Sequence, residues 1–236
     1  MYKVFIRQFY WLFLAIAVIA LSAIVSSHTY GAVKFSDYFT DGDDAGWAQL
    51  NRDWSLTLGR YVLDGDYKPD NIERGGWTVT HAGDKKWRNY QLSATFDNTN
   101  APGKPSPDVH SAEFLVRVKE SGVPGVNGTF YRIAVWPIGT TDPRGGGGTI
   151  ANGLVQISKI VKGSQVEYVD KESSNTAVGT NAIIIKVDGD KIQITINGNK
   201  ILTWKDKSKP ILYGGIGLGA IWEAEAWFDN VIVSTP

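Results

Sequence analysis

After residue 33 the sequence contains no apolar repeat with helical spacing, and this absence constrains the fold more than any other feature. Short runs that alternate apolar and polar residues recur instead, separated by Gly, Asn, Asp or Pro. Phe114, Val116 and Val118 occupy alternate positions of one run and are expected on one face of a strand. Arg117 is expected on the opposite face. Such alternation predicts an all-β chain.

The second half of the chain contains two turn signals between alternating runs. They are Asp188-Gly189-Asp190 and Asn197-Gly198-Asn199, whose residues accept a positive φ at little cost, so both are predicted to be hairpin turns. Weaker candidates bring the total to about 12 to 14 strands, which is too many for one flat sheet. The sequence therefore predicts a two-sheet antiparallel β-sandwich.

The N-terminus has the order of a secretory signal. Lys3 and Arg7 precede an apolar run over 9–25, and small and polar residues follow. We predict a signal peptide over 1–32 and a β-sandwich domain over 33–236. The alternative is an uncleaved membrane anchor, because about 17 apolar residues lie at the lower end of what spans a bilayer. In both cases the domain is expected to be secreted, periplasmic or at the cell surface.

Cysteine and charge exclude several classes of function. The chain has no cysteine, which excludes disulfides, a thiolate nucleophile and cysteine-ligated zinc. It has 24 basic and 24 acidic residues, and the basic ones form no cluster. Because nucleic-acid binding requires grouped Lys and Arg, no nucleic-acid partner is expected.

Several short strings along the mature chain are similar to those of known proteins. They are Phe35-Ser36-Asp37-Tyr38-Phe39, Trp54-Ser55-Leu56, Trp87-Arg88-Asn89-Tyr90, Phe114-Leu115-Val116-Arg117, Lys186-Val187-Asp188-Gly189, Gly215-Ile216-Gly217-Leu218 and Phe228-Asp229-Asn230-Val231. Together they resemble the concanavalin A-like lectin/glucanase superfamily, in particular laminin G-like modules and bacterial 3-keto-disaccharide hydrolase-like domains. This resemblance implies a jelly roll whose concave sheet and rim loops bind glycans. It also implies a structural calcium near the paired first and last strands.

The carboxylates needed for glycoside hydrolysis are hard to find. The reaction uses two carboxyl groups about 5 to 10 Å apart, and the glucanase string Glu-x-Asp-x-x-Glu is absent. Glu223 and Glu225 share a strand face, but two surface acids near the C-terminus explain them more simply. The sequence therefore leans away from an enzyme without settling the question.

A second set of candidates consists of His110, Glu113, Arg117 and Arg132. Glu113 and Arg117 are four apart in one predicted strand and so are expected on the same face, with Arg132 on a neighbouring strand. This set could bind an acidic sugar or transfer protons, with Glu113 and His110 as catalytic candidates. The alternative is a cross-strand ion pair on a solvated face.

Aromatic residues favour sugar binding, because their rings stack on the C–H faces of pyranoses. Trp136 alternates with Arg132 so as to share its face, which makes it the preferred ligand contact. The alternative is that Trp136 belongs to the core. The predicted ligand-binding set is therefore Glu113, Arg117, Arg132 and Trp136.

Acidic residues near the two ends of the domain suggest a metal site. Asp37 and Asp41 lie near the first strand and Asp229 lies in the last, so terminal strand pairing would gather oxygen ligands for calcium. The alternative is that these aspartates cap turns.

The leading hypothesis is a secreted, noncatalytic carbohydrate-binding module that contacts an extracellular or cell-wall polysaccharide or glycoconjugate. One alternative is a glycoside hydrolase or keto-glycoside hydrolase that uses the same concave face. Another is a structural or adhesive surface domain. A membrane partner is expected only through the N-terminal segment, if that segment is not cleaved.

Overall fold

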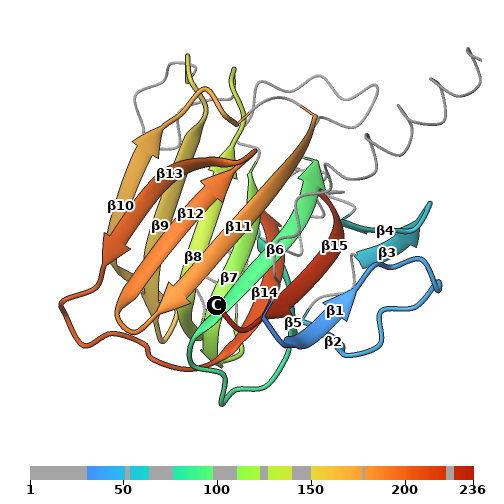
Figure 1. Ribbon diagram of the computed structural model, residues 1–236, viewed down its shortest axis with the longest axis horizontal. Helices are drawn as coiled ribbons and strands as arrows, with labels where there is room; N and C mark the ends of the chain where they lie inside the picture. Colours follow the sequence, from blue (N-terminus) through green and yellow to red (C-terminus); the bar gives the residue numbers. More distant parts are fainter. Residues whose placement is uncertain are drawn as a thin grey trace, which may run out of the picture. The chain divides into compact units, whose positions relative to one another are not determined.

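The computed structural model describes residues 31–50, 54–63, 77–97, 111–122, 127–139, 150–176, 179–221 and 226–236 (Figure 1). The chain divides into two units, residues 1–30 and 31–236, and every described residue belongs to the second. The expected signal segment, the catalytic candidate His110 and the pair Glu223 and Glu225 lie outside the described residues. Within the described ranges, no helix has the length and hydropathy needed to cross a membrane.

The described residues form fifteen strands. They are β1 (Val33–Asp37), β2 (Trp47–Gln49), β3 (Trp54–Thr57), β4 (Arg60–Leu63), β5 (Trp77–Ala82), β6 (Tyr90–Asp97), β7 (Ala112–Glu120), β8 (Thr129–Trp136), β9 (Leu154–Val161), β10 (Ser164–Glu172), β11 (Thr180–Asp188), β12 (Lys191–Ile196), β13 (Asn199–Lys205), β14 (Gly215–Ile221) and β15 (Ala226–Ser234).

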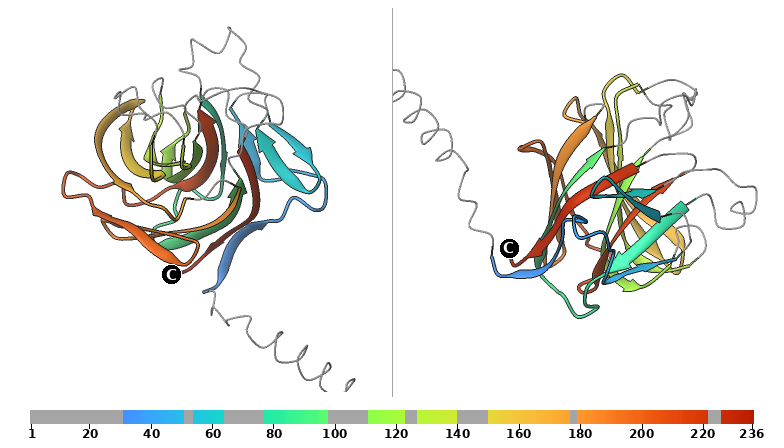
Figure 2. Two further views of the ribbon diagram at one scale, coloured as in Figure 1. Left: turned by 90° about the horizontal axis from the view of Figure 1, so that it is seen from above. Right: turned by 90° about the vertical axis from the view of Figure 1, so that its right-hand side faces the viewer.

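These strands form two antiparallel sheets. The first has the order β13-β12-β11-β6-β15-β4-β3, with β1 also paired to β15, and the second has the order β10-β9-β8-β7-β14-β5-β2. The left view of Figure 2 shows the second sheet strongly curved, with the first sheet against its convex side. The predicted all-β, two-sheet jelly-roll sandwich is confirmed.

The core lies between the sheets and is built from alternate residues of each strand. Phe114 of β7 contacts Phe96 of β6 and Phe228 of β15 edge to face, with ring centroids 5.3 and 5.5 Å apart. Because β7 belongs to the second sheet and β6 and β15 to the first, this aromatic group joins the two layers. Burying each such ring stabilises the fold by roughly 1.5–3 kcal/mol.

The predicted hairpins are confirmed. The turn between β11 and β12 contains Gly189 at a φ of 54°, and the turn between β12 and β13 contains Asn197 and Gly198 at φ values of 49° and 79°. The first and last strands also pair, with Asp37 opposite Val231, as the resemblance implies.

One strand departs from simple alternation. Arg117 has a φ of 54°, and the pairing of β7 shifts register on both sides at this point. Val118 consequently leaves the face of Phe114 and Val116 and packs with Leu115 in a separate cluster. The prediction that Val118 shares the face of Phe114 and Val116 is therefore wrong.

Candidate functional site

The face of the second sheet that is turned away from the first sheet, here called the outer face, is not a solvated surface. β7 is buried from Ala112 to Val118, all of β8 is buried, and β9 is buried from Leu154 to Ile160. Since only every second residue points into the core, the other half of these buried side chains lies on the outer face. The side chains on the outer face of these three strands are therefore buried as well.

Apolar and polar side chains are segregated on the outer face. One apolar cluster contains Val79, Leu115, Val118, Phe130 and Ile160. A second apolar cluster contains Ala134, Trp136, Ile150 and Leu154. Buried polar side chains from β7, β8 and β9, and from the residue just before β7, also lie on this face, and we call them the polar row: Ser111, Glu113, Arg132, Gln156 and Ser158.

The polar row is centred on an ion pair. Arg132 Nη2 lies 2.5 Å from Glu113 Oε1, and the hydroxyl of Ser111 donates to the same oxygen at 3.1 Å. The Glu113 side chain is fully buried and that of Arg132 is 7% exposed. The predicted pairing of Glu113 and Arg132 across neighbouring strands is confirmed, but the pair is buried and is not the solvated pair of the alternative interpretation.

The third strand continues the polar row. Ser158 lies opposite Arg132, and Gln156 lies opposite Ala134. The hydroxyl of Ser158 donates to the amide oxygen of Gln156 at 2.9 Å. Sequence reasoning missed both residues, although their alternation with Val155 and Ile157 placed them on the same face as Arg132.

Trp136 borders the polar row at the C-terminal end of β8. The guanidinium carbon of Arg132 lies 5.7 Å from the centroid of the Trp136 ring, so the predicted shared face is confirmed. The ring is 2% exposed and packs on Ala134 and Leu154. Its indole N–H has no hydrogen-bond acceptor among the described residues. Trp136 is therefore an aromatic side chain with an unused donor beside the ion pair.

β14 contributes no side chain to the outer face over two positions. Ile216, Leu218 and Ala220 point into the core, so Gly217 and Gly219 face outward. They lie opposite Leu115 and Glu113 on one side and opposite His81 and Val79 on the other, as the strand pairings show. A Cβ at residue 219 would lie 3.7 Å from Glu113 Cβ. The two glycines thus form a strip of β14 that carries no side chains of its own, here called the side-chain-free strip, and side chains of His81, Leu115 and Val79 lie close to it.

His81 stands on the far side of this strip. Its Nε2 lies 3.3 Å from the carbonyl oxygen of Gly122, and its Nδ1 has no hydrogen-bond partner within the described part of the chain. Burial lowers the pKa of His81 to about 4, so the ring is neutral at pH 7. A neutral imidazole is the form that accepts a proton, and sequence reasoning did not select this residue.

Arg117 does not join Glu113. Its positive φ and the β7 register shift turn the side chain away from the outer face, and Nη1 donates to the carbonyl oxygen of Ile211 at 2.6 Å. Burial lowers the pKa of its guanidinium. The prediction that Glu113 and Arg117 share a face is wrong, because a spacing of four residues implies one face only in a regular strand.

The three predicted calcium ligands serve local structure. Asp37 accepts the indole N–H of Trp47 at 2.8 Å through one oxygen and the backbone N–H of Phe39 at 2.8 Å through the other. Asp41 accepts from the N–H of Asp43, and Asp229 accepts from the N–H of the next residue at 2.6 Å. Burial raises the pKa of Asp37.

The predicted calcium ligands form no cluster in the described ranges. The ranges that the structure describes hold no group of three or more acidic or histidine side chains placed to bind a metal. Both oxygens of the best candidate, Asp37, already accept hydrogen bonds. The calcium site stays a prediction of the sequence resemblance.

Solved structures define the class of this fold. It is similar to carbohydrate binding module CBM66 from Bacillus subtilis, with 15% identity, a TM-score of 0.56 and coverage of 80% of this chain and 96% of that one. It is also similar to a Bacillus subtilis protein with a galectin-like fold, with 14% identity, a TM-score of 0.59 and coverage of 87% and 97%. A Bacillus licheniformis β-glucanase matches with 10% identity, a TM-score of 0.56 and coverage of 87% and 99%. The fold is therefore the concanavalin A-like or galectin-like β-sandwich of glucanases and carbohydrate-binding modules.

Within that class, the sequence identifies a family. Residues 34–234 match the family described as the 3-keto-alpha-glucoside-1,2-lyase-like domain. The chain belongs to this family. The resemblance to 3-keto-disaccharide hydrolase-like domains is confirmed. No curated protein matches the sequence.

Proposed function

We propose that the protein binds a carbohydrate on the outer face of the second sheet, and that the polar row recognises the sugar hydroxyls. The observation that carries this proposal is the buried Glu113–Arg132 pair. Removing two charges from water is costly, and apolar side chains would stabilise a sheet face at least as well. The apolar clusters on the same face show that the fold can use them.

The chemistry of the polar row suits a polyol. A carboxylate accepts hydrogen bonds and a guanidinium donates several in a fixed plane, so together they recognise hydroxyls that both donate and accept. The Trp136 ring lies beside Arg132, and its indole N–H, which has no acceptor among the described residues, can donate to a sugar oxygen. Membership of a family named for a glucoside-cleaving activity supports a sugar as the ligand.

Glycan-array screening of the full chain, followed by calorimetric titration of the best glycan, tests this proposal. Glu113→Gln keeps the size of the side chain and removes its charge, so we expect at least tenfold weaker binding. The matched control is Lys205→Gln, which removes an exposed ion pair with Asp190. Thermal unfolding establishes that both variants are folded. A folded Glu113→Gln variant with unchanged affinity, or an array without any bound glycan, would contradict the proposal.

A second candidate function is the elimination reaction in the family's name. In a 3-keto-α-glucoside the ketone acidifies the C2 hydrogen, so a base can remove it while the C1–O bond breaks and the aglycone oxygen takes a proton. The position of His81 on the outer face favours this reaction, because its Nδ1 has no hydrogen-bond partner among the described residues and can accept the proton. Arg132 can donate to the ketone oxygen as negative charge develops there. The catalytic assignment of Glu113 and His110 remains a prediction, and His110 lies outside the described residues.

Release of 4-nitrophenol from 4-nitrophenyl 3-keto-α-glucoside tests this second function. Elimination predicts release by the wild-type protein and at least a hundredfold slower release by His81→Gln. Glycan binding without release of 4-nitrophenol would support the noncatalytic carbohydrate-binding module. The absence of both binding and release would support a structural or adhesive domain.

We also propose that the chain is exported through residues 1–32. The order of basic, apolar and small residues in this segment supports export. N-terminal sequencing of protein recovered outside the cytoplasm tests it. A start near residue 33 is expected, a start at Met1 in the membrane fraction would indicate an anchor, and recovery in the cytoplasm would contradict export.

A further inference from the structure

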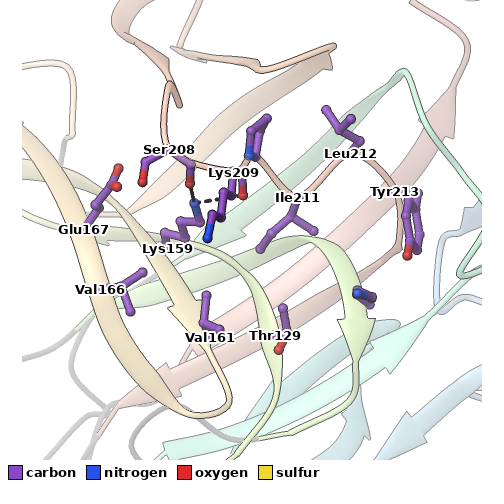
Figure 3. Close-up of a pocket in the computed structure, with 12 residues that line it drawn as sticks. Thr129, Lys159, Val161, Val166, Glu167, Ser208, Lys209, Ile211, Leu212 and Tyr213 are labelled. Carbon is purple, nitrogen blue, oxygen red and sulfur yellow. Dashed lines mark hydrogen bonds between the residues drawn. The ribbon is translucent and has the colours of Figure 1, made fainter.

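A groove separate from the polar row lies between the β9–β10 hairpin and the segment from Asp206 to Gly214, which joins β13 to β14 (Figure 3). Its volume is about 560 Å³, within the usual range for ligand sites. Lys119, which lines the groove, is six residues along β7 from Glu113, or about 20 Å in an extended strand. A ligand in this groove would therefore occupy a different site from one on the polar row.

One wall of the groove is irregular in backbone, yet buried side chains hold it. The ammonium group of Lys159 donates to the carbonyl oxygens of Ser208 and Lys209, and it lies 2.8 Å from Asp206 Oδ2. Figure 3 shows Lys159 reaching from β9 to this wall. The side chains of Lys159 and Asp206 are 5% and 0% exposed.

Two further interior side chains fix the same wall. The hydroxyl of Tyr131 donates to Asp206 Oδ2 at 2.5 Å and accepts the N–H of Ile211 at 2.9 Å. Arg117 donates to the carbonyl oxygen of Ile211 at 2.6 Å. Both backbone polar groups of Ile211 are thus held from inside the domain.

The buried Lys159–Asp206 ion pair orders the segment from Asp206 to Gly214, although burying its charges is costly. Burial alone would raise the pKa of Asp206, but hydrogen bonds from Lys159 and Tyr131 hold that pKa below its ordinary value. A buried ion pair contributes little net stability, because desolvation offsets the attraction. Its effect here is to hold one conformation of the wall, which lowers the entropy lost when a ligand binds.

The exposed part of the groove combines an aromatic platform with positive charge. Tyr213 is 38% exposed, and the Lys119 ammonium lies 5.6 Å from the centroid of its ring. Lys209 also lines the groove, and among the described residues that line it Glu167 is the one acidic residue. Because Asp206 balances Lys159, the cations of Lys119 and Lys209 outnumber the single carboxylate.

We propose that this groove binds a carboxylated pyranose, that is, a uronic-acid residue of an acidic polysaccharide. The sugar's C–H face would stack on Tyr213, and its carboxylate would pair with Lys119 and Lys209. A neutral sugar would leave the two ammonium groups without a partner. An acidic peptide would use the charges but would not require the aromatic platform.

Calorimetric titration of the full chain with trigalacturonate tests this assignment. We expect binding that weakens as salt increases, with maltotriose at least tenfold weaker because it lacks carboxylates. Tyr213→Ala and the double variant Lys119→Gln/Lys209→Gln should each lose at least tenfold in affinity. Tyr213→Phe keeps the ring and should bind like the wild type. The matched charge control is Lys200→Gln, an exposed residue of β13 outside the groove.

Thermal unfolding of each variant separates a lost contact from a lost fold. The proposal is overturned if trigalacturonate does not bind, or if a folded Tyr213→Ala variant binds it unchanged. Polyglutamate binding as tight as trigalacturonate would assign the groove to acidic peptides instead and would also overturn it. Groove variants should leave binding of the array-selected glycan unchanged, so the two sites are tested separately.

Discussion

Two buried ion pairs differ in what they hold together. Glu113 and Arg132 join two neighbouring strands that are already hydrogen-bonded to each other, so their pairing adds little to the order of the backbone. Lys159 and Asp206 join a strand to an irregular segment, which Tyr131 and Arg117 also hold through Asp206 and Ile211. The first pair therefore adds little to the order that its two strands already have, whereas the second helps to shape a wall of the groove.

The largest expected effect follows from breaking the second pair. Asp206→Ala would leave Lys159 buried without its counter-charge and remove the acceptor of Tyr131. We expect a loss of about 3–5 kcal/mol in the free energy of unfolding, measured by urea denaturation. Replacing both partners, as in Lys159→Met/Asp206→Leu, should recover most of that stability and still loosen the groove. A loss below about 1 kcal/mol for Asp206→Ala would contradict this account.

A second prediction concerns pH and the outer face. His81 has an ordinary pKa of 6.5 and a folded pKa of about 4. Between these values the unfolded chain binds a proton that the folded chain does not. The contribution of His81 to stability is therefore fully present above pH 6.5 and is lost as the pH falls towards 4. The loss should be about 3 kcal/mol.

Urea denaturation at pH 7 and pH 4 measures this loss in the wild type and in His81→Gln. The variant should lose less stability on acidification, because it lacks the titrating group of His81. The acidic residues also titrate, but they are common to both proteins and cancel in the comparison. An identical pH dependence in the two proteins would show that His81 does not titrate in this way.

A smaller effect is expected from filling the side-chain-free strip. In Gly217→Ala the new Cβ would lie 2.7 Å from the carbonyl oxygen of Thr80 and 3.0 Å from His81 Nδ1, so the backbone must shift. We expect a loss of about 1–3 kcal/mol and weaker glycan binding. The control Ala182→Ser, at an exposed position of the first sheet, should change neither. Full retention of both properties in Gly217→Ala would argue against a role for the strip.

The smallest effect is expected at the surface. Lys205 and Asp190 are 3.5 Å apart with side chains 60% and 37% exposed, so solvent screens their attraction. Lys205→Gln should change the free energy of unfolding by less than about 1 kcal/mol. A larger change would mean that exposure is a poor guide to the difference between the ion pairs of this protein.

Alternation and turn residues were enough to predict the sandwich, the hairpins, and the shared face of Arg132 with Glu113 and Trp136. These features depend on neighbours along the chain or on regular strand geometry. The bulge at Arg117 could not be predicted, because a non-glycine residue at positive φ leaves no local pattern. Its consequence was the wrong placement of the Arg117 side chain.

Other parts of the site depend on contacts between distant segments. Lys159 and Asp206 are far apart in the sequence, and Asp206 lies outside any strand, so alternation says nothing about their meeting. The glycines of β14 did carry a signal, since alternating glycines in a strand mark a strip without side chains. His81 carried none, because its lowered pKa results from burial that only the folded chain provides.

The most direct test of carbohydrate binding on the outer face is an NMR titration of the labelled full chain with the array-selected glycan. We expect the side-chain N–H signals of Arg132 and Trp136 to shift, because these side chains lie together beside Glu113. Saturable binding that leaves both signals unmoved would contradict it.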